Sequence, residues 1–257
     1  MVKLIYLVSG PMGRTPEGQE ELQRRRAFLK RHAAAETEVD ITDIDRGPGS
    51  IESMFEEYLS IPATAQRAYE LQQEGWDGIL LGCYGDPGLD ALRELVDIPV
   101  VGAGEATALM AASLGHRFSI ITVTQSVIAA QEKQMKAIGI DSKLASVRAV
   151  DIPVLDLRRD RELAIEACVN EGRLAIEQDR ADTLICGCMS MGFLEIAEQA
   201  GAELGVPFLN PARVQLKWLE ALLGAGLTHS RRAYMTPPKL ATGKAATPDD
   251  LFHISQN

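Results

Sequence analysis

Residues 78–87 read Gly78-Ile79-Leu80-Leu81-Gly82-Cys83-Tyr84-Gly85-Asp86-Pro87, and this stretch decides the fold. A short apolar run bounded by glycine is typical of a strand in a parallel sheet that is covered on both faces. Asp86 and Pro87 then predict the start of a helix, with Asp86 as its cap and Pro87 in its first position. Because ligands bind at the carboxyl ends of such strands, the thiol of Cys83 is expected at a site.

The second half of the chain repeats this pattern. Residues 182–188 read Asp182-Thr183-Leu184-Ile185-Cys186-Gly187-Cys188, and residues 77–83 show the same order of an aspartate, an apolar run and Gly-Cys. In both halves a helical pattern and a second short strand come next, with strands predicted at residues 98–101 and 206–209. Ser190 is expected to cap the helix after Cys188. The chain is therefore predicted to be duplicated, with one thiol at an equivalent place in each half.

Strands and helices alternate along the rest of the chain. Further strands are predicted at residues 3–8, 37–41, 117–124 and 146–149, and helices at 17–32, 53–58, 63–73, 86–95, 105–114, 125–138, 161–178, 193–204 and 211–223, the first of them on the surface. Such alternation predicts an α/β protein. The segment 46–50 lacks the ending of a phosphate-binding loop, so it is interpreted as a turn. The chain from His229 onward is rich in Pro, Gly and Thr, and residues 236–257 are predicted to be a tail that packs loosely or reaches a neighbouring subunit.

Composition limits the classes of function. The chain has 257 residues, of which 46% are hydrophobic, and a formal net charge of -10, which suits a globular protein with a large core. The acidic balance argues against a nucleic-acid surface and against attraction to an anionic membrane. Neither a signal-peptide pattern nor a long apolar run is present in the sequence, so a cytoplasmic protein is predicted.

The cysteines are too few and too widely spread for a disulfide framework, so reduced thiols are expected at Cys83, Cys168, Cys186 and Cys188. Cys186 and Cys188 have the spacing of half a metal site, but no second pair of Cys or His stands at ligand spacing, so no metal is predicted. Cys168 and Cys186 lie inside a predicted helix and strand and are interpreted as apolar filler. The four histidines and most carboxylates are assigned to the surface.

Cys83 and Cys188 would face each other across a cleft if the two halves are related by a pseudo-two-fold axis. Such a pair can invert a stereocentre next to a carbonyl, because one thiolate removes a proton from one face while the other thiol protonates the opposite face. Backbone N–H groups at the helix starts would hold the developing enolate oxygen, and no cofactor is required. The alternative is that both cysteines are small apolar residues of a binding protein that does no chemistry.

Several stretches resemble hydantoin and allantoin racemases of the aspartate/glutamate/hydantoin racemase superfamily. The likeness covers residues 3–223 and rests on Cys83-Tyr84-Gly85-Asp86-Pro87-Gly88-Leu89 and on the segments 117–122, 147–155 and 187–191. It implies two similar lobes, each a four-stranded parallel sheet flanked by helices, with the site in the cleft between them. The implied division is 1–105 plus 208–230 for the first lobe, 106–207 for the second and 231–257 for the tail. A homo-oligomer is also implied.

The resemblance implies that Cys83 and Cys188 are the catalytic thiols of a racemase that needs neither metal nor cofactor. The implied substrate contacts are Ser9, Gly10, Tyr84, Gly85, Thr122, Gly187 and Met189. The chain departs from hydantoin racemases at residues 8–12, which replace an Asn-Pro-Asn-x-Thr-like loop, and at Gly-Cys-Met-Ser-Met, which replaces Gly-Cys-Ala-Gly-Met.

These features favour a small-molecule substrate such as a 5-substituted hydantoin or a related amino-acid derivative. Three alternatives stay open at this point: a maleate isomerase, an enzyme similar to arylmalonate decarboxylase, and a non-catalytic two-lobed protein that binds a metabolite.

Overall fold

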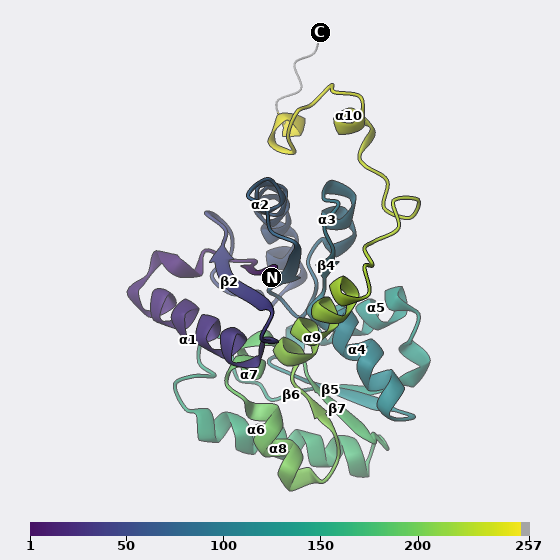
Figure 1. Cartoon of the computed structure of the whole chain (residues 1–257). Coiled ribbons are helices and arrows are strands. Elements are labelled where there is room, and N and C mark those ends of the chain that lie inside the picture. The colour runs from purple at the N-terminus through teal and green to yellow at the C-terminus, as the bar shows by residue number, and fades with distance from the viewer. Residues whose placement is uncertain (253–257) are drawn as a thin grey trace.

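The computed structural model of the chain describes residues 1–252 and contains two parallel sheets flanked by helices (Figure 1). The first sheet has the order β2-β1-β3-β4, with β1 (Val2–Val8), β2 (Thr37–Asp43), β3 (Gly78–Leu81) and β4 (Val100–Val101). The second has the order β6-β5-β7-β8, with β5 (Phe118–Thr122), β6 (Leu144–Ala149), β7 (Thr183–Cys186) and β8 (Phe208–Leu209). Every strand pair is parallel. The predicted α/β fold of two similar lobes is confirmed.

Ten α-helices and four short 3-10 helices complete the described part of the chain. The α-helices are α1 (Pro16–His32), α2 (Met54–Gln73), α3 (Leu89–Leu95), α4 (Ala103–Leu114), α5 (Ile128–Ile138), α6 (Arg161–Glu177), α7 (Met189–Phe193), α8 (Ile196–Leu204), α9 (Pro211–Gly224) and α10 (Pro238–Ala241). The 3-10 helices are η1 (Met12–Arg14), η2 (Gln125–Val127), η3 (Asp141–Lys143) and η4 (Asp249–Phe252). Within residues 1–252, no helix combines the length and the apolar character needed to cross a bilayer.

The duplication also appears in two hydrogen bonds near the starts of the central strands. The Asp77 carboxylate accepts the backbone N–H of Lys3 at 2.8 Å. In the second lobe the Asp182 carboxylate accepts the N–H of His116, also at 2.8 Å. Each aspartate therefore holds the chain near the start of the first strand of its own sheet, inside β1 in the first lobe and just before β5 in the second.

The glycine before each of the two mirrored cysteines is required by the neighbouring strand. Gly82 donates its N–H to the Leu7 carbonyl at 2.8 Å, and Gly187 donates to the Ile121 carbonyl at 2.7 Å. A Cβ at Gly82 would lie 2.4 Å from the Leu7 carbonyl oxygen, and one at Gly187 would lie 2.6 Å from the Cγ2 of Ile120. The glycine of each Gly-Cys pair thus stands where a larger residue would clash with the neighbouring strand.

Helices α4 and α9 each leave the sheet that they follow in the chain and cover the other one. Ala108 and Ala111 of α4 belong to the core cluster of the second sheet, whereas Leu216 and Leu219 of α9 belong to that of the first. Gln215 on α9 donates to carbonyl oxygens at the ends of β3 and β4, at 2.9 and 2.7 Å. The two helices lie side by side between the sheets (Figure 1). The lobe boundaries at 105/106 and 207/208 stay a prediction.

The prediction of two helices at 53–58 and 63–73 is wrong, because α2 continues through Pro62. The ring removes one backbone donor, but nearby hydroxyl groups satisfy carbonyls of the same turns. Ser60 donates to the Glu57 carbonyl at 2.7 Å, and Thr64 donates to the Ser60 carbonyl at 2.8 Å. Both side chains are fully buried, so tertiary packing overrides the local preference to break.

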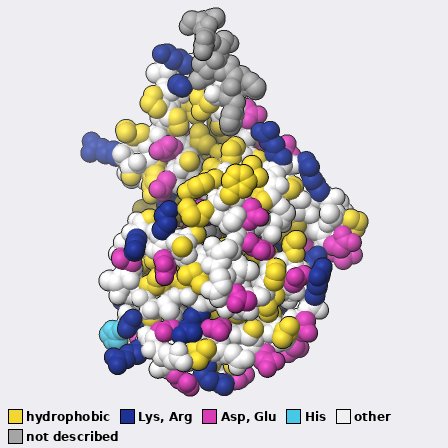
Figure 2. Space-filling view, turned by 180° about the vertical axis from the view of Figure 1, so that it is seen from behind, with side chains coloured by type: hydrophobic (Ala, Val, Ile, Leu, Met, Phe, Trp, Pro, Cys, Tyr) yellow, Lys and Arg dark blue, Asp and Glu magenta, His cyan; other side chains and the backbone are white. Residues whose placement is uncertain are grey.

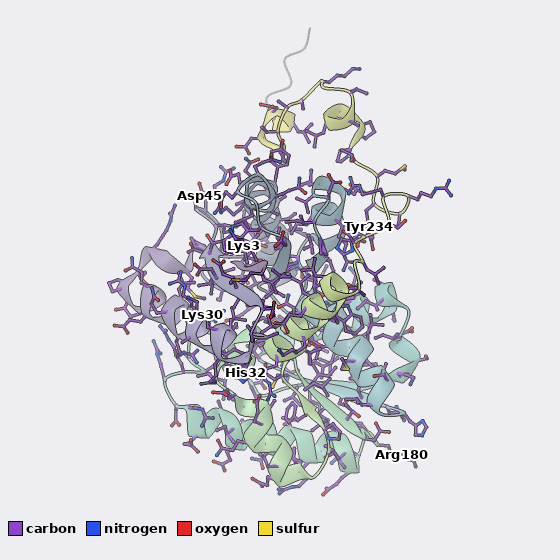
Figure 3. All side chains as sticks on the ribbon, viewed as in Figure 1. Lys3, Lys30, His32, Asp45, Arg180 and Tyr234 are labelled. Atoms are coloured by element: carbon purple, nitrogen blue, oxygen red, sulfur yellow. The ribbon has the colours of Figure 1, made fainter. Side chains whose placement is uncertain are left out.

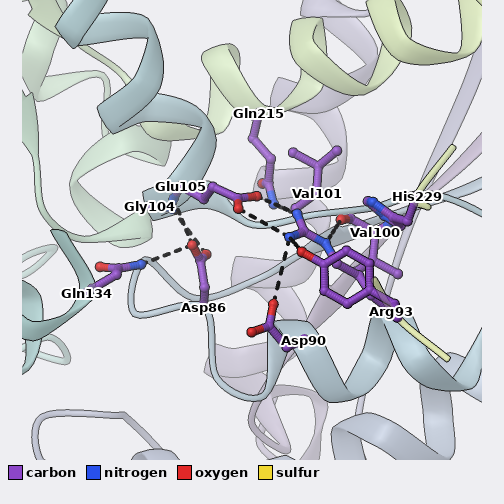
Figure 4. Close-up of polar contacts among 11 residues, drawn as sticks. Asp86, Asp90, Arg93, Val100, Val101, Gly104, Glu105, Gln134, Gln215 and His229 are labelled. Atoms are coloured by element: carbon purple, nitrogen blue, oxygen red, sulfur yellow. Dashed lines mark hydrogen bonds and ion pairs between the residues drawn. The ribbon is translucent and has the colours of Figure 1, made fainter. Parts of the chain in front are cut away.

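The start predicted for the next helix is also wrong, because Asp86 does not cap the helix that comes after it. Asp86 adopts a left-handed conformation with φ of 53°, and α3 begins only at Leu89. The Asp86 carboxylate instead accepts the N–H groups of Gly104 and Glu105, at 3.1 and 2.7 Å, at the start of α4 (Figure 4). The helix predicted at 193–204 is likewise two helices, because Glu195 has a φ of 56°.

The first part of the tail is tied to the first lobe. Tyr234 lies where the tail passes α3 (Figure 3), and its hydroxyl accepts a hydrogen bond from Arg93 at 3.2 Å. The Nε2 of His229 accepts the Val100 N–H at 2.6 Å, and burial lowers the pKa of His229 to about 4, helped by the charge of Arg93. His229 is thus half-buried and bonded to the first lobe, not fully exposed as a surface residue would be. On the face seen in Figure 2, basic and acidic side chains are interspersed, and hydrophobic ones gather in the upper half.

Candidate active site

A cavity of about 350 Å³ lies between the lobes at the carboxyl ends of the central strands, and both mirrored cysteines line it. Cys83 comes directly after Gly82 at the end of β3, Cys188 has the same place at the end of β7, and both side chains are partly exposed. Cys168 and Cys186 are fully buried in the core of the second lobe, so their interpretation as apolar filler is confirmed. The structure brings together the two thiols that the duplicated pattern singled out.

The Cys83 thiol lies among acidic groups. Burial raises the pKa of Cys83, and the negative charges of Cys188, Asp86 and Glu57 raise it further. The N–H of Gly85 is the group that acts in the opposite direction. These surroundings favour the neutral thiol form of Cys83.

The Cys188 thiol has a more favourable environment for negative charge. Burial raises the pKa of Cys188 above its ordinary value, and the N–H groups of Ser190 and Met191, the Arg25 guanidinium and the Ser190 hydroxyl make this rise smaller. The prediction that Ser190 caps the helix after Cys188 is wrong. Cys188 itself occupies the cap position of α7, and the Ser190 hydroxyl accepts a hydrogen bond from Arg25 at 2.9 Å.

Arg25 is a lining residue that the sequence interpretation missed. The prediction of a surface helix at 17–32 is wrong for this side chain, which is only 5% exposed. The Nε donates to Glu21 at 2.7 Å, and the guanidinium carbon lies 4.8 Å from the ring centroid of Phe193. In the sequence, Glu21 and Arg25 stand four residues apart, which predicts an ion pair on one face of a helix. This spacing does not tell a buried face from an exposed one.

Tyr6 also contributes to the environment of the thiols. It is fully buried on β1, and its ring packs edge-on against Phe193 with centroids 5.2 Å apart. Burial raises the pKa of Tyr6 well above its ordinary value, Arg25 lowers it, and both thiols raise it. Tyr6 is therefore a neutral phenol within electrostatic reach of Cys83, Cys188 and Arg25.

Most of the predicted contacts line the cavity, namely Ser9, Gly10, Tyr84, Gly85, Gly187 and Met189. The ring of Tyr84, however, is buried in the core cluster around the second sheet, so it is packed away from solvent. Thr122 does not line the cavity. It is fully buried, and its hydroxyl donates to the Gly187 carbonyl at 3.3 Å. The hydroxyl of Ser9 is buried, and no residue of the described chain accepts or donates to it.

Helix α5 provides two glutamines that hold the two strand ends. Gln131 donates to the Gly187 carbonyl and to the Thr122 hydroxyl, both at 2.9 Å. Gln134 donates to the Tyr84 carbonyl at 3.1 Å and to the Asp86 carboxylate at 3.0 Å (Figure 4). One helix thus fixes the residues beside both cysteines.

Other lining residues come from segments to which the sequence interpretation gave no role in the site. The predicted turn at 46–50 supplies Pro48, Gly49 and Ser50, and α2 supplies Met54, Glu57 and Tyr58. Burial raises the pKa of Glu57, while the charge of Lys133 lowers it. No group of three or more His, Cys, Asp and Glu side chains suited to a metal ion occurs within residues 1–252.

Two duplicated parallel lobes around a cavity with one thiol from each define the class as a two-lobed racemase. The chain matches the Asp/Glu/Hydantoin racemase family over residues 20–218, and it belongs to this family. A hydantoin racemase of Pseudomonas sp. (strain NS671) is 35% identical over 211 residues, which cover 82% of this chain and 84% of the relative. A hydantoin racemase of Rhizobium meliloti is 32% identical over 205 residues, covering 80% and 83%.

Solved structures show the same likeness. The allantoin racemase from Klebsiella pneumoniae superposes with a TM-score of 0.85 at 28% identity, covering 93% of this chain and 95% of that one. A variant of arylmalonate decarboxylase superposes with a TM-score of 0.64 at 17% identity and shares the fold. The protein is an isomerase of the racemase type.

Proposed function

We propose that the protein racemises 5-substituted hydantoins or closely related amino-acid derivatives by a two-base mechanism between Cys83 and Cys188. The observation that carries the proposal is the placement of one thiol from each lobe on the same cavity, at the ends of equivalent strands. A thiol on each side of a bound carbon acid is the arrangement that inversion requires. The names of the hydantoin racemase relatives support the same chemistry.

In this mechanism one thiolate takes the proton from the carbon next to the carbonyl, and the electron pair moves to the carbonyl oxygen as an enolate. The other thiol then protonates the opposite face and becomes the thiolate. Ser9 is the donor proposed for the enolate oxygen, because its buried hydroxyl lines the cavity without a partner in the described chain.

The lining favours a bulky substrate with little charge. Apolar side chains from both lobes surround the cavity, namely Val8, Met12, Ile51, Met54, Val123, Val127, Ala130, Ala137 and Val154. The charged side chains at the cavity are Arg25, Glu57 and Lys133. Arg25 is already paired with Glu21, which leaves its charge partly compensated. An apolar substituent on the hydantoin ring would therefore occupy the larger part of the space.

The test is proton exchange and loss of optical rotation in heavy water, with single enantiomers of 5-substituted hydantoins and of allantoin. We expect Cys83→Ala and Cys188→Ala each to lower racemisation by at least about 10³-fold, because each removes one of the two bases. Cys186→Ala is the matched control, since Cys186 is fully buried and lies outside the cavity. Full activity in either Cys83→Ala or Cys188→Ala contradicts the mechanism.

Incubation with maleate and with an arylmalonate separates the alternatives. Conversion of either compound, without exchange of any hydantoin, would favour the isomerase or the decarboxylase chemistry instead. The cytoplasmic location and the homo-oligomer stay predictions, and light scattering on the purified protein tests the second.

A further inference from the structure

The two thiols share Tyr6 as a neighbour but differ in the charged groups that act on them. Cys188 faces Arg25 from α1, Tyr6 from β1 and the Ser190 hydroxyl from α7, and the thiols of Cys83, Cys168 and Cys186 are the other titratable groups near it. Cys83 faces Glu57 from α2, Asp86 from its own loop and Cys188 across the cavity. Lys133 from α5 acts on Glu57. The one cation that acts directly on a thiol is thus on the Cys188 side, within the described chain.

Arg25 is held in a single orientation by three groups. Glu21 accepts from its Nε at 2.7 Å, Ser190 accepts from its Nη2 at 2.9 Å, and Phe193 lies beneath its guanidinium. Arg24 shares the Glu21 carboxylate and donates to the Phe193 carbonyl at 2.7 Å. A planar guanidinium fixed in this way keeps its charge at one place in a region of low dielectric, where a charge acts strongly on its neighbours.

The Ser190 hydroxyl connects the guanidinium to the thiol. Ser190 accepts a hydrogen bond from Arg25, which leaves its own proton to donate to Cys188. The connection therefore depends on a single side chain at the wall of the cavity.

We propose that Arg25, acting with Ser190 at the wall of the cavity, is a positioning residue that makes Cys188 the more readily ionised of the two thiols, so that the reactive form of the enzyme carries its charge on Cys188 and its proton on Cys83. The inference rests on the proposed two-thiol function for its catalytic meaning. This reactive form then accepts directly the enantiomer whose proton faces Cys188. Cys188 takes that proton, Cys83 gives its proton to the opposite face, and the charge returns to Cys188 when one proton passes back from Cys188 to Cys83.

The test measures the reactivity of each thiol and needs no substrate. Alkylation by iodoacetamide is monitored from about pH 6 to about pH 10, and each cysteine is quantified by peptide mass spectrometry. We expect Cys188 to react faster than Cys83 in the wild type at neutral pH. In Arg25→Met the rate at Cys188 should fall about tenfold or more, which corresponds to about one pKa unit, while Cys83 changes little. Arg25→Lys should restore part of the rate, and Ser190→Gly should lie between the wild type and Arg25→Met.

Arg26→Met is the matched control, because Arg26 lies on the same helix, pairs with Asp40 and does not line the cavity. Glu21→Gln combined with Arg25→Met removes the negative charge of a carboxylate that would otherwise lose one of its paired guanidinium groups and keep that of Arg24. A faster Cys83 in the wild type, or an equal loss at both thiols in Arg25→Met and in the double variant, overturns the inference. Loss of racemisation of every hydantoin with this thiol pattern intact would count against the proposed function alone.

Discussion

The ends of β3 and β7 share one backbone design but differ in the structure that the chain forms after the cysteine. In both lobes a glycine bonds to the neighbouring central strand and delivers a cysteine to the cavity. After Cys83 the chain forms a loop in which Asp86 reaches the start of α4, whereas after Cys188 a helix begins at once. The comparison teaches that duplication has kept the part that positions the thiols, while the surroundings that set their charge have diverged.

The divergence has a physical consequence for catalysis. Acidic neighbours favour the neutral form of Cys83, and Arg25 favours the charged form of Cys188. Equivalent strand ends can therefore hold unequal protonation states, as a two-base mechanism requires in its resting state. Substitutions at the glycines, at Asp86 and on α5 test how far the two ends are equivalent.

The largest effect is expected for an added methyl group at the two strand-end glycines. Gly82→Ala places Cβ 2.4 Å from the Leu7 carbonyl oxygen, and backbone cannot yield easily, so a loss of about 3 kcal/mol in the free energy of unfolding is expected. Gly187→Ala meets the Cγ2 of Ile120 at 2.6 Å, a less severe overlap with a side-chain atom rather than with backbone, and about 2 kcal/mol is expected. Urea unfolding measures both.

Gly224→Ala is the control, because nothing lies within 4 Å of its added Cβ. Its stability should stay within about 0.5 kcal/mol of the wild type. A larger loss in Gly187→Ala than in Gly82→Ala would show that the second strand end is the more rigid one, which reverses the comparison.

A smaller effect is expected from Asp86, which has no counterpart in the second lobe. Burial raises the pKa of Asp86 from 3.8 to about 7, against the opposing N–H groups of Glu105 and Gly104. The folded state then binds more protons than the unfolded state between these pH values, so its contribution to stability is present at about pH 4 and is lost as the pH rises to about 7. Asp86→Asn should remove most of this dependence of stability on pH.

Denaturant unfolding at several pH values measures this difference. Asp90→Asn is the matched control, because the side chain of Asp90 is 81% exposed and lies in the next helix. Parallel curves of stability against pH for the wild type and Asp86→Asn would show that the pKa of Asp86 is not raised.

The smallest effect is expected at α5, where one glutamine serves each strand end. Gln131→Leu leaves the Gly187 carbonyl without this donor, and Gln134→Leu does the same to the Tyr84 carbonyl. Each should cost about 1 kcal/mol of stability, since a buried acceptor loses its partner. Thermal unfolding compares them with Glu132→Leu, an exposed position on the same helix. Equal losses of stability would mean that both strand ends are held equally. No loss in Gln134→Leu would mean that Gln131 alone stabilises a strand end.

Local pattern is sufficient to find the strands and the two thiols, because a short apolar run with Gly-Cys at its end is a property of neighbouring residues. Local pattern is insufficient to predict the role of Asp86, since the carboxylate of an Asp-Pro pair can cap the next helix or accept N–H groups of a later helix. It also fails at Pro62, where buried hydroxyl groups keep α2 continuous. In both cases the outcome depends on groups that are distant in the chain or on their burial.

The order of elements, the duplication and the identity of Cys83 and Cys188 as the candidate pair can all be read from the chain, because each is encoded within one strand and the turn after it. The environment of the pair cannot be read in this way. Arg25, Tyr6 and Ser190 come from three separate elements and meet only when the lobes pack together. Burial then strengthens the effect of these groups, above all of the Arg25 charge, on the thiol of Cys188. Burial is a property of the folded chain alone.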